Sequence, residues 1–294
     1  RDLHSFPTRR SSDLANVNIM NKSFVNTSSI LKIPLIFLLF ISFLSCDDDG
    51  VLPIFQPSYD KQLGQELSVQ ISNDTQTYPL LKNATAKEYL QNIVDEIIKA
   101  PEIKYAKQFD YQVEIINSNV INAFAIPGGY VYVHLGLLKY LESEAELAAI
   151  LAHEIAHIDK RHSVQTIQKQ YGVSFLVDLF MPENASQLTT FATDLLTNLA
   201  FLRNSRENEF EADEYSFYYL CSTKWYPAAG KDFFSRMLKQ SKTTPNIFEE
   251  IFSTHPTDEN RIEKLNKLIE AKGIASATEA NLFKERYKQF KNSI

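Results

Sequence analysis

The stretch LAHEIAHIDKRH, residues 151–162, most constrains the fold, because it combines an apolar helical stripe with several ionisable side chains. Apolar residues recur every three or four positions, which predicts a buried amphipathic helix over residues 143–162. The stripe consists of Leu147, Leu151, Ile155 and Ile158. Ionisable groups on a buried helix are costly unless they are paired, so a second segment must pack against this helix and satisfy them.

His153 and His157 are the candidate metal ligands on this helix. Residues four apart project from the same helical face, so both imidazoles can reach one tetrahedral Zn²⁺ ion. Glu154 lies beside them, where it can act as a general base on a water molecule, and the pattern is the HExxH zinc motif. The alternative is a surface helix that carries this pattern by chance, and the apolar stripe argues against it. His162, near the helix end, is predicted to be a solvated or capping residue.

A catalytic zinc needs a third protein ligand and one open position. The candidate segment is NSRENEFEAD, residues 204–213, because it is acidic and helical spacing places its glutamates on different faces. Glu209 shares a face with small side chains that allow close approach to a partner helix, so we predict Glu209 as the third ligand. Asp213, one turn further on, is predicted to accept a hydrogen bond from a ligating histidine and fix its tautomer. The alternative for Glu209 is an ordinary surface carboxylate.

The rest of the chain predicts one α+β domain that is mostly helical. Short strands are predicted at 111–116, 122–126 and 130–133, with a Pro-Gly-Gly turn between the last two. Helices are predicted at 85–99, 137–141, 143–162, 164–180, 186–201, 204–222, 227–241, 256–271 and 277–291. We therefore expect a small antiparallel sheet followed by helices that surround the HExxH helix. The apolar part of 164–201 is predicted to be mostly core, with a lid over the site as the alternative.

Charge and cysteine content exclude two classes of protein. The chain has 294 residues and a net charge of −6, so no nucleic-acid partner is predicted, since such a partner requires a clustered basic surface. Its two cysteines, Cys46 and Cys221, are too few for a disulfide framework.

The N-terminal region predicts export. Residues 1–14, RDLHSFPTRRSSDL, match nothing downstream in character, and we treat residues 1–19 as an extension foreign to the natural protein. Residues 20–45 combine two lysines with the run IPLIFLLFISFLS, which is shorter than the about 20 apolar residues that a membrane-spanning helix needs. This segment is therefore predicted to be a lipoprotein signal peptide, with an uncleaved anchor as the alternative.

FLSC, residues 43–46, resembles the lipoprotein signal box, in which the cysteine carries the lipid. Cys46 is the predicted lipidation site and the link to a membrane, which leaves Cys221 as a buried thiol. Residues 46–72 are predicted to form an acidic, proline-containing tether and leading segment, flexible over 47–60, before a folded domain at 73–294. The predicted location is the cell envelope, with a lipid anchor in the outer membrane, at its periplasmic face or at the cell surface.

Four ordered blocks resemble the M48 family of zinc metallopeptidases. They are NAFAIPGGYVYVHLGLL, ELAAILAHEIAHIDKRH, SRENEFEAD and STHPTDENRI. The resemblance spans roughly residues 85–270 and points to the compact bacterial lipoprotein and periplasmic branch, which is Oma1-like. It implies a zincin-type fold with one Zn²⁺ per chain, held by His153, His157 and Glu209, with Asp213 completing an E-x-x-x-D pattern.

The resemblance also implies that His255 and Arg261 lie near the metal. Both could stabilise the transition state, and His255 could instead cap the zinc and hold the enzyme latent. The alternative is a histidine that precedes a helix and an arginine in a surface ion pair. Four strand residues are predicted to form an edge that pairs with an extended substrate, and these are Tyr130, Val131, Tyr132 and Val133.

The sequence thus predicts a zinc-dependent endopeptidase with Glu154 as its base. Its expected substrates are polypeptides, including misfolded envelope proteins, in cell-envelope protein quality control. One alternative is a non-catalytic, chaperone-like binder of envelope proteins that retains the zinc fold. The other is a scaffold with structural zinc, which requires a closed set of four ligands.

Overall fold

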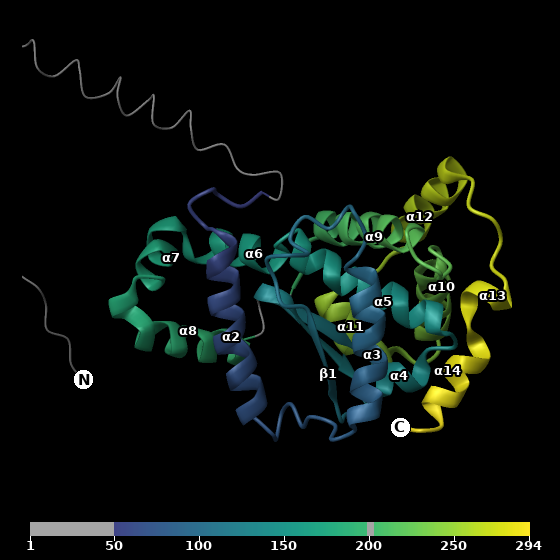
Figure 1. Ribbon diagram of the computed structural model, residues 1–294, viewed down its shortest axis with the longest axis horizontal. Helices are drawn as coiled ribbons and strands as arrows, with labels where there is room; N and C mark the ends of the chain where they lie inside the picture. The colour runs from purple at the N-terminus through teal and green to yellow at the C-terminus, as the bar shows by residue number, and fades with distance from the viewer. Residues whose placement is uncertain (1–49, 199–202) are drawn as a thin grey trace, which may run out of the picture. The chain divides into compact units, whose positions relative to one another are not determined.

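A three-stranded mixed sheet lies at the centre of the computed structural model, which describes residues 50–198 and 203–294 (Figure 1). Its strands are β1 (Gln112–Ile116), β2 (Ala123–Ile126) and β3 (Tyr130–His134), in the order β1-β3-β2. The α+β class with a helical majority is confirmed. The prediction of a wholly antiparallel sheet is wrong, since β3 is antiparallel to β2 but parallel to β1. The connection from β1 to β2 skips one strand position, and β3 fills it parallel to β1.

The same strand order corrects the prediction of a substrate-pairing edge. The strand that contains Tyr130, Val131, Tyr132 and Val133 is β3, which is paired on both sides. A strand with two neighbours has no backbone groups left for a third. β1 and β2 are the two edge strands of the sheet. Residues 79–81 pair with the end of β1, through Leu81 N to Ile115 O and Asn117 N to Pro79 O, whereas no strand among the described residues pairs with the outer side of β2.

The two faces of the sheet contribute to two hydrophobic cores, because side chains alternate along a strand. Val131 and Val133 face the larger core, whereas Tyr132 between them faces the smaller one. Helices of the larger core are α3 (Ala84–Ile97), α4 (Leu135–Tyr140), α5 (Glu144–Asp159), α9 (Arg206–Cys221), α10 (Ala229–Ser241), α11 (Glu249–Thr254), α12 (Glu259–Lys272), α13 (Glu279–Leu282) and α14 (Lys284–Lys291). Helices of the smaller core are α2 (Pro57–Asn73), α6 (His162–Tyr171), α7 (Val173–Leu179) and α8 (Ala185–Asn198). In Figure 1, α7 and α8 lie beside α2, away from α10 and α14.

The segment from 164 onward is core rather than a loose lid, as far as it is described. Its apolar residues pack with α2 and with one face of the sheet in the smaller core. The single helix predicted at 164–180 is two helices, because Gly172 between them has a φ of 81°. The helix predicted at 277–291 is likewise divided into α13 and α14, by Phe283 with a φ of 54°.

α5 is buried along its whole length, as the apolar stripe predicted. The hydroxyl of Ser143 accepts a hydrogen bond from the Glu146 amide and caps its first turn. The helix ends at Asp159 and not at 162, because Arg161 adopts the left-handed conformation with a φ of 56°. The chain therefore changes direction at Arg161, and His162 begins a new helix, α6.

Arg161 is held in this conformation by α2. Its guanidinium donates to both carboxylate oxygens of the buried Asp60, over 3.0 and 2.7 Å, and to the Phe55 carbonyl. Val51 and Phe55 are buried, and α2 begins at Pro57, so the prediction of a flexible tether is wrong from Val51 onward. Few apolar residues mark α2, but those it has recur every four positions and fill the smaller core.

α14 joins the C-terminal end of the chain to the start of α5. The buried carboxylate of Glu144 accepts hydrogen bonds from Tyr89, Trp225 and Arg286, which come from three separate segments.

The Cys221 thiol at the end of α9 is exposed, so the prediction that it is buried is wrong.

Residues 50–198 and 203–294 contain no helix that combines the length and apolar character needed to cross a bilayer. Residues 1–19, the predicted signal peptide at 20–45 and Cys46 lie outside the described residues.

Gly64 provides a test of how closely α2 approaches the turn before β3. A Cβ on Gly64 would lie 1.9 Å from the Pro127 carbonyl oxygen, a backbone atom that cannot yield without moving the turn. We expect Gly64→Ala to lower the free energy of unfolding by at least about 1–3 kcal/mol in chemical denaturation, although alanine is the better helix former. Gly230→Ala is the control, because its nearest contact is an ordinary 3.5 Å. Equal stabilities of the two variants would contradict the close approach.

Candidate metal centre

α5 and α9 bring the three predicted ligands to one point in the larger core. The His153 and His157 Nε2 atoms lie 3.0 Å apart. Glu209, which is fully buried, places Oε2 3.4 Å from His153 Nε2 and Oε1 3.3 Å from His157 Nε2. Small side chains such as Ala212 allow α9 to pack closely along α5. The sequence predicted this, because Glu209 shares a helical face with small residues.

The spacing of these donor atoms fits one zinc ion. A tetrahedral zinc with ligand bonds of about 2.0–2.1 Å separates its donor atoms by about 3.4 Å. The three separations are 3.0, 3.4 and 3.3 Å, close to that value. Imidazole nitrogen and carboxylate oxygen are also the donor types that catalytic zinc prefers in proteins.

His255 adds a fourth donor to this group. Its Nδ1 lies 3.0 Å from Glu209 Oε1, and the four residues offer donor atoms within 4.8 Å of one another. Its Nε2 lies 3.3 Å from the Ala123 carbonyl oxygen on β2 and 3.5 Å from Glu154 Oε1. His255 is the residue that follows the last turn of α11, and through Ala123 it contacts β2.

The buried carboxylates favour a cation at this point. Glu154, Glu209 and Asp213 are buried, and Arg261 is the one buried guanidinium in the described part of the chain that contacts any of them, namely Glu209 and Asp213. Unpaired buried charge is costly, and one divalent ion would neutralise the excess. Glu154 Oε2 is also buried without a hydrogen-bond partner among the described residues, as a group awaiting a ligand would be.

The ionisation of the metal-free site is strongly perturbed. Burial raises the pKa of Glu154, and two nearby imidazoles oppose that rise. Burial lowers the pKa of His153, but its contacts with Asp213 and Glu209 outweigh this effect and raise the pKa to about 9. The pKa of His157 is well below its usual range, because burial dominates there. A metal ion that binds at neutral pH therefore displaces a proton from His153.

Asp213 and Arg261 support the ligands from behind. Asp213 Oδ1 lies 3.1 Å from His153 Nδ1. The other ring nitrogen of His153, Nε2, is the one that faces His157 and Glu209. Arg261 donates to both oxygens of Asp213 over 2.7 Å and lies 2.7 Å from Glu209 Oε2. The guanidinium of Arg261 is thus directed at the carboxylates of Glu209 and Asp213. In this position it orients those two side chains.

His162 lies inside the site, and the prediction of a solvated or capping residue is wrong. The ring is fully buried, with Nδ1 2.8 Å from His157 Nδ1 and Nε2 3.1 Å from Glu211 Oε2. The reason is the turn at Arg161, because a continued helix would have directed residue 162 to a different side. No local pattern marks a left-handed arginine, so the sequence carried no signal for this placement.

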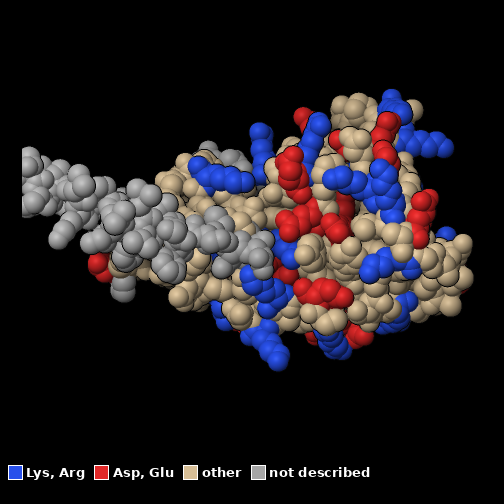
Figure 2. Space-filling model, turned by 90° about the horizontal axis from the view of Figure 1, so that it is seen from above, with Lys and Arg blue, Asp and Glu red and all other residues tan. Residues whose placement is uncertain are grey.

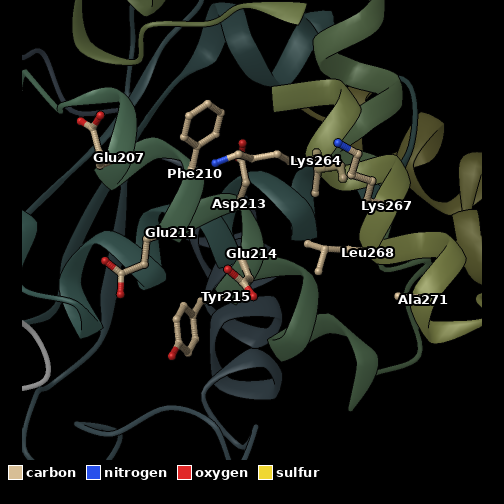
Figure 3. A pocket seen from close by; sticks show the side chains of 11 residues that line it. Glu207, Phe210, Glu211, Asp213, Glu214, Tyr215, Lys264, Lys267, Leu268 and Ala271 are labelled. Atoms are coloured by element: carbon tan, nitrogen blue, oxygen red, sulfur yellow. The ribbon is translucent and has the colours of Figure 1, made fainter. Parts of the chain in front are cut away.

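A surface pocket of about 770 Å³ lies on the outer side of the site, between α9 and α12. Figure 3 shows Glu207 and Glu211 on one side of α9, with Lys264, Lys267 and Leu268 contributed from α12 on the other. The buried Asp213 lies at the base of this pocket. On the face seen in Figure 2, acidic and basic side chains are interspersed.

Comparison with known proteins identifies one family of peptidases and two relatives that are proteases. The family model described as "Peptidase family M48" matches residues 84–269. The beta-barrel assembly-enhancing protease of Escherichia coli is 28% identical over 195 residues, which is 63% of this chain and 39% of that protein. The mitochondrial metalloendopeptidase OMA1 of Schizosaccharomyces pombe is 28% identical over 212 residues, 72% of this chain and 61% of that protein. The match thus covers well under half of the E. coli protein.

The ligand assignment can be tested by metal binding alone. We expect Glu209→Ala to weaken zinc binding by more than the about 10–100-fold typical of supporting groups, and Asp213→Asn to fall within that range. The measurement is competition with a chromophoric chelator, together with metal content after dialysis. Glu207→Ala is the control, since that glutamate is exposed on the same helix. Full zinc retention in Glu209→Ala would reject the assignment.

Proposed function

This chain belongs to peptidase family M48, and from that premise we propose that it is a zinc-dependent endopeptidase that hydrolyses peptide bonds of envelope polypeptides. The observation that carries the proposal is Glu154, a buried carboxylate beside three donors that fit one zinc, with one oxygen that has no hydrogen-bond partner among the described residues. A protein that only binds zinc or polypeptides has no use for such a group. This feature favours an enzyme over the chaperone-like binder.

Glu154 is the general base and acid of the proposed reaction. Its raised pKa brings it closer to neutrality, so it can take a proton from water and later deliver it to the leaving amine. Zinc, when bound by His153, His157 and Glu209, supplies a Lewis acid that lowers the pKa of water and polarises a carbonyl group. Arg261 holds Glu209 and Asp213 in place and thereby fixes the ligand geometry.

The open edge of β2 is the proposed template for the substrate. Along an antiparallel edge strand, alternate residues direct their backbone groups outward. The Ala123 carbonyl contacts His255 on that side, so the backbone groups of Ala123 and Ala125 face away from β3. An extended peptide that pairs there would pass beside the metal point. Backbone pairing reads little side-chain identity, which suits a protease for misfolded polypeptides.

His255 is proposed to hold the site latent. It supplies the fourth donor of the metal group, and it also contacts the carbonyl of Ala123 that a substrate would use. A substrate on β2 and His255 in this position therefore exclude one another. The alternative role, a donor to the transition state, needs His255 to remain near the metal while substrate is bound. The four-donor set also matches a structural zinc site, and the buried Glu154 argues against that scaffold.

We place this activity in the cell envelope, with Cys46 lipidated and the chain anchored in the outer membrane. Support comes from the signal-like segment 20–45 and from the E. coli relative, whose name refers to beta-barrel assembly. The proposed substrates are envelope proteins that have failed to fold or assemble, and the proposed process is protein quality control.

The base assignment is tested with Glu154→Gln. Loss of the carboxylate removes proton transfer but no metal ligand, so peptide hydrolysis should fall by at least about 10²–10⁴-fold with zinc content unchanged. Casein degradation and a quenched peptide can report the rate, and metal analysis reports zinc. Glu214→Gln, a substitution of an exposed glutamate on α9, is the control. Equal hydrolysis by wild type and Glu154→Gln would reject the mechanism.

His255→Ala distinguishes the two roles of that histidine. If His255 leaves the β2 edge free in about one wild-type molecule in ten, removing its imidazole raises kcat/KM about tenfold, and we expect a rise of this order. Ser253→Ala, on the exposed side of α11, should leave kcat/KM unchanged. A lower kcat/KM in His255→Ala with full zinc content would support transition-state donation and contradict the gate.

A further inference from the structure

His162 is a buried histidine to which neither the ligand set nor the proposed reaction assigns a part. It lies at the first position of α6, between the ligand His157 on α5 and Glu211 on α9. Each of its two ring nitrogens faces one of these groups, at 2.8 and 3.1 Å. A buried ring with both nitrogens occupied in this way links a metal ligand to a carboxylate.

The two ligating imidazoles are supported differently. His153 has the Asp213 carboxylate 3.1 Å from its Nδ1, whereas the Nδ1 of His157 faces another imidazole. A ligating histidine requires a partner for its second nitrogen, which fixes the tautomer and the ring orientation. The only group that the described residues place within hydrogen-bond distance of His157 Nδ1 is His162.

One assignment of protons satisfies all of these contacts. When the His157 Nε2 lone pair faces the metal, the proton of that ring is on Nδ1. His157 Nδ1–H then donates to His162 Nδ1, which must carry a lone pair. The proton of His162 is consequently on Nε2, where it donates to Glu211 Oε2. Both histidines are neutral in this arrangement, and Glu211 accepts the hydrogen bond from His162.

We propose that His162 and Glu211 are positioning residues that fix the tautomer and orientation of His157 for zinc. Asp213 faces the Nδ1 of His153 directly, whereas Glu211 acts on the Nδ1 of His157 through the ring of His162. This proposal rests on His157 being a zinc ligand and does not depend on peptide hydrolysis.

The local backbone supports a dedicated arrangement. His162 reaches His157 only because Arg161 takes a left-handed conformation, which non-glycine residues rarely adopt. Asp60 and the Phe55 carbonyl, both from the region of α2, hold Arg161 in that state. Glu211, in contrast, has 37% of its side-chain surface exposed and lines the pocket in Figure 3. Its substitution therefore leaves the core intact.

Zinc affinity is the measurement that tests the proposal, by chelator competition on the full chain carrying Glu154→Gln, so that hydrolysis plays no part. We expect His162→Phe, which fills the space without an acceptor, to weaken zinc binding about 10–100-fold. His162→Asn should recover most of that loss, because Oδ1 can accept from His157 at the position of Nδ1. Glu211→Gln should weaken binding by a smaller factor, and Glu207→Gln, on the same pocket wall, by none.

A second measurement separates positioning from packing. Co²⁺ in place of zinc has visible absorption bands that report the ligand geometry, and these should shift in His162→Phe and return in His162→Asn. Changed thermal stability of the metal-free variants with unchanged zinc affinity and Co²⁺ spectra would overturn the proposal and leave His162 as a packing residue. If His162→Phe does not fold, wild-type zinc affinity together with an unshifted Co²⁺ spectrum in Glu211→Gln would overturn it. Failure of the Glu154→Gln parent to bind zinc would reject both this proposal and the proposed function.

Discussion

The packing of α9 against α5 is the interaction on which the rest of the structure depends. It buries Glu209 and Asp213 against two histidines of α5, beside the larger hydrophobic core. Groups of this kind would destabilise the fold if any of them lacked a partner, because an unpaired buried charge is expensive. Arg261 on α12 and a divalent ion complete the set. Metal binding and folding of this region are therefore expected to be coupled.

Side-chain contacts hold α5 in place at both of its ends. Glu144 at the start of α5 is tied to three segments, and Arg161 just after its end is tied to α2. With both ends fixed, α5 has little freedom to rotate its histidines away from Glu209. This explains why two regions far from the metal in sequence, residues 50–64 and the C-terminal helix, pack directly against the ends of that helix.

The sequence predicted what depends on local spacing and missed what depends on distant partners. HExxH, the acidic segment at 204–213 and the strand boundaries all rest on periodicity within one segment, and the structure places them as expected. The place of β3 in the sheet depends on the order in which non-adjacent strands pair, which no single strand encodes. His162 was missed because Arg161 breaks the helix only with the help of Asp60, a hundred residues earlier.

The ligands of the metal centre are supported by hydrogen-bonded side chains on one side and contact His255 on another. Behind the ligands, Asp213, Arg261, His162 and Glu211 form hydrogen bonds that all converge on α9. On the side of the β2 edge, His255 follows α11 and contacts the Ala123 carbonyl oxygen at 3.3 Å, Glu209 at 3.0 Å and Glu154 at 3.5 Å. Displacing Arg261 would leave the buried carboxylates of Glu209 and Asp213 without their guanidinium partner. In the proposed gating, a substrate on β2 would displace His255 and leave His153, His157 and Glu209, with their supporting groups, in place.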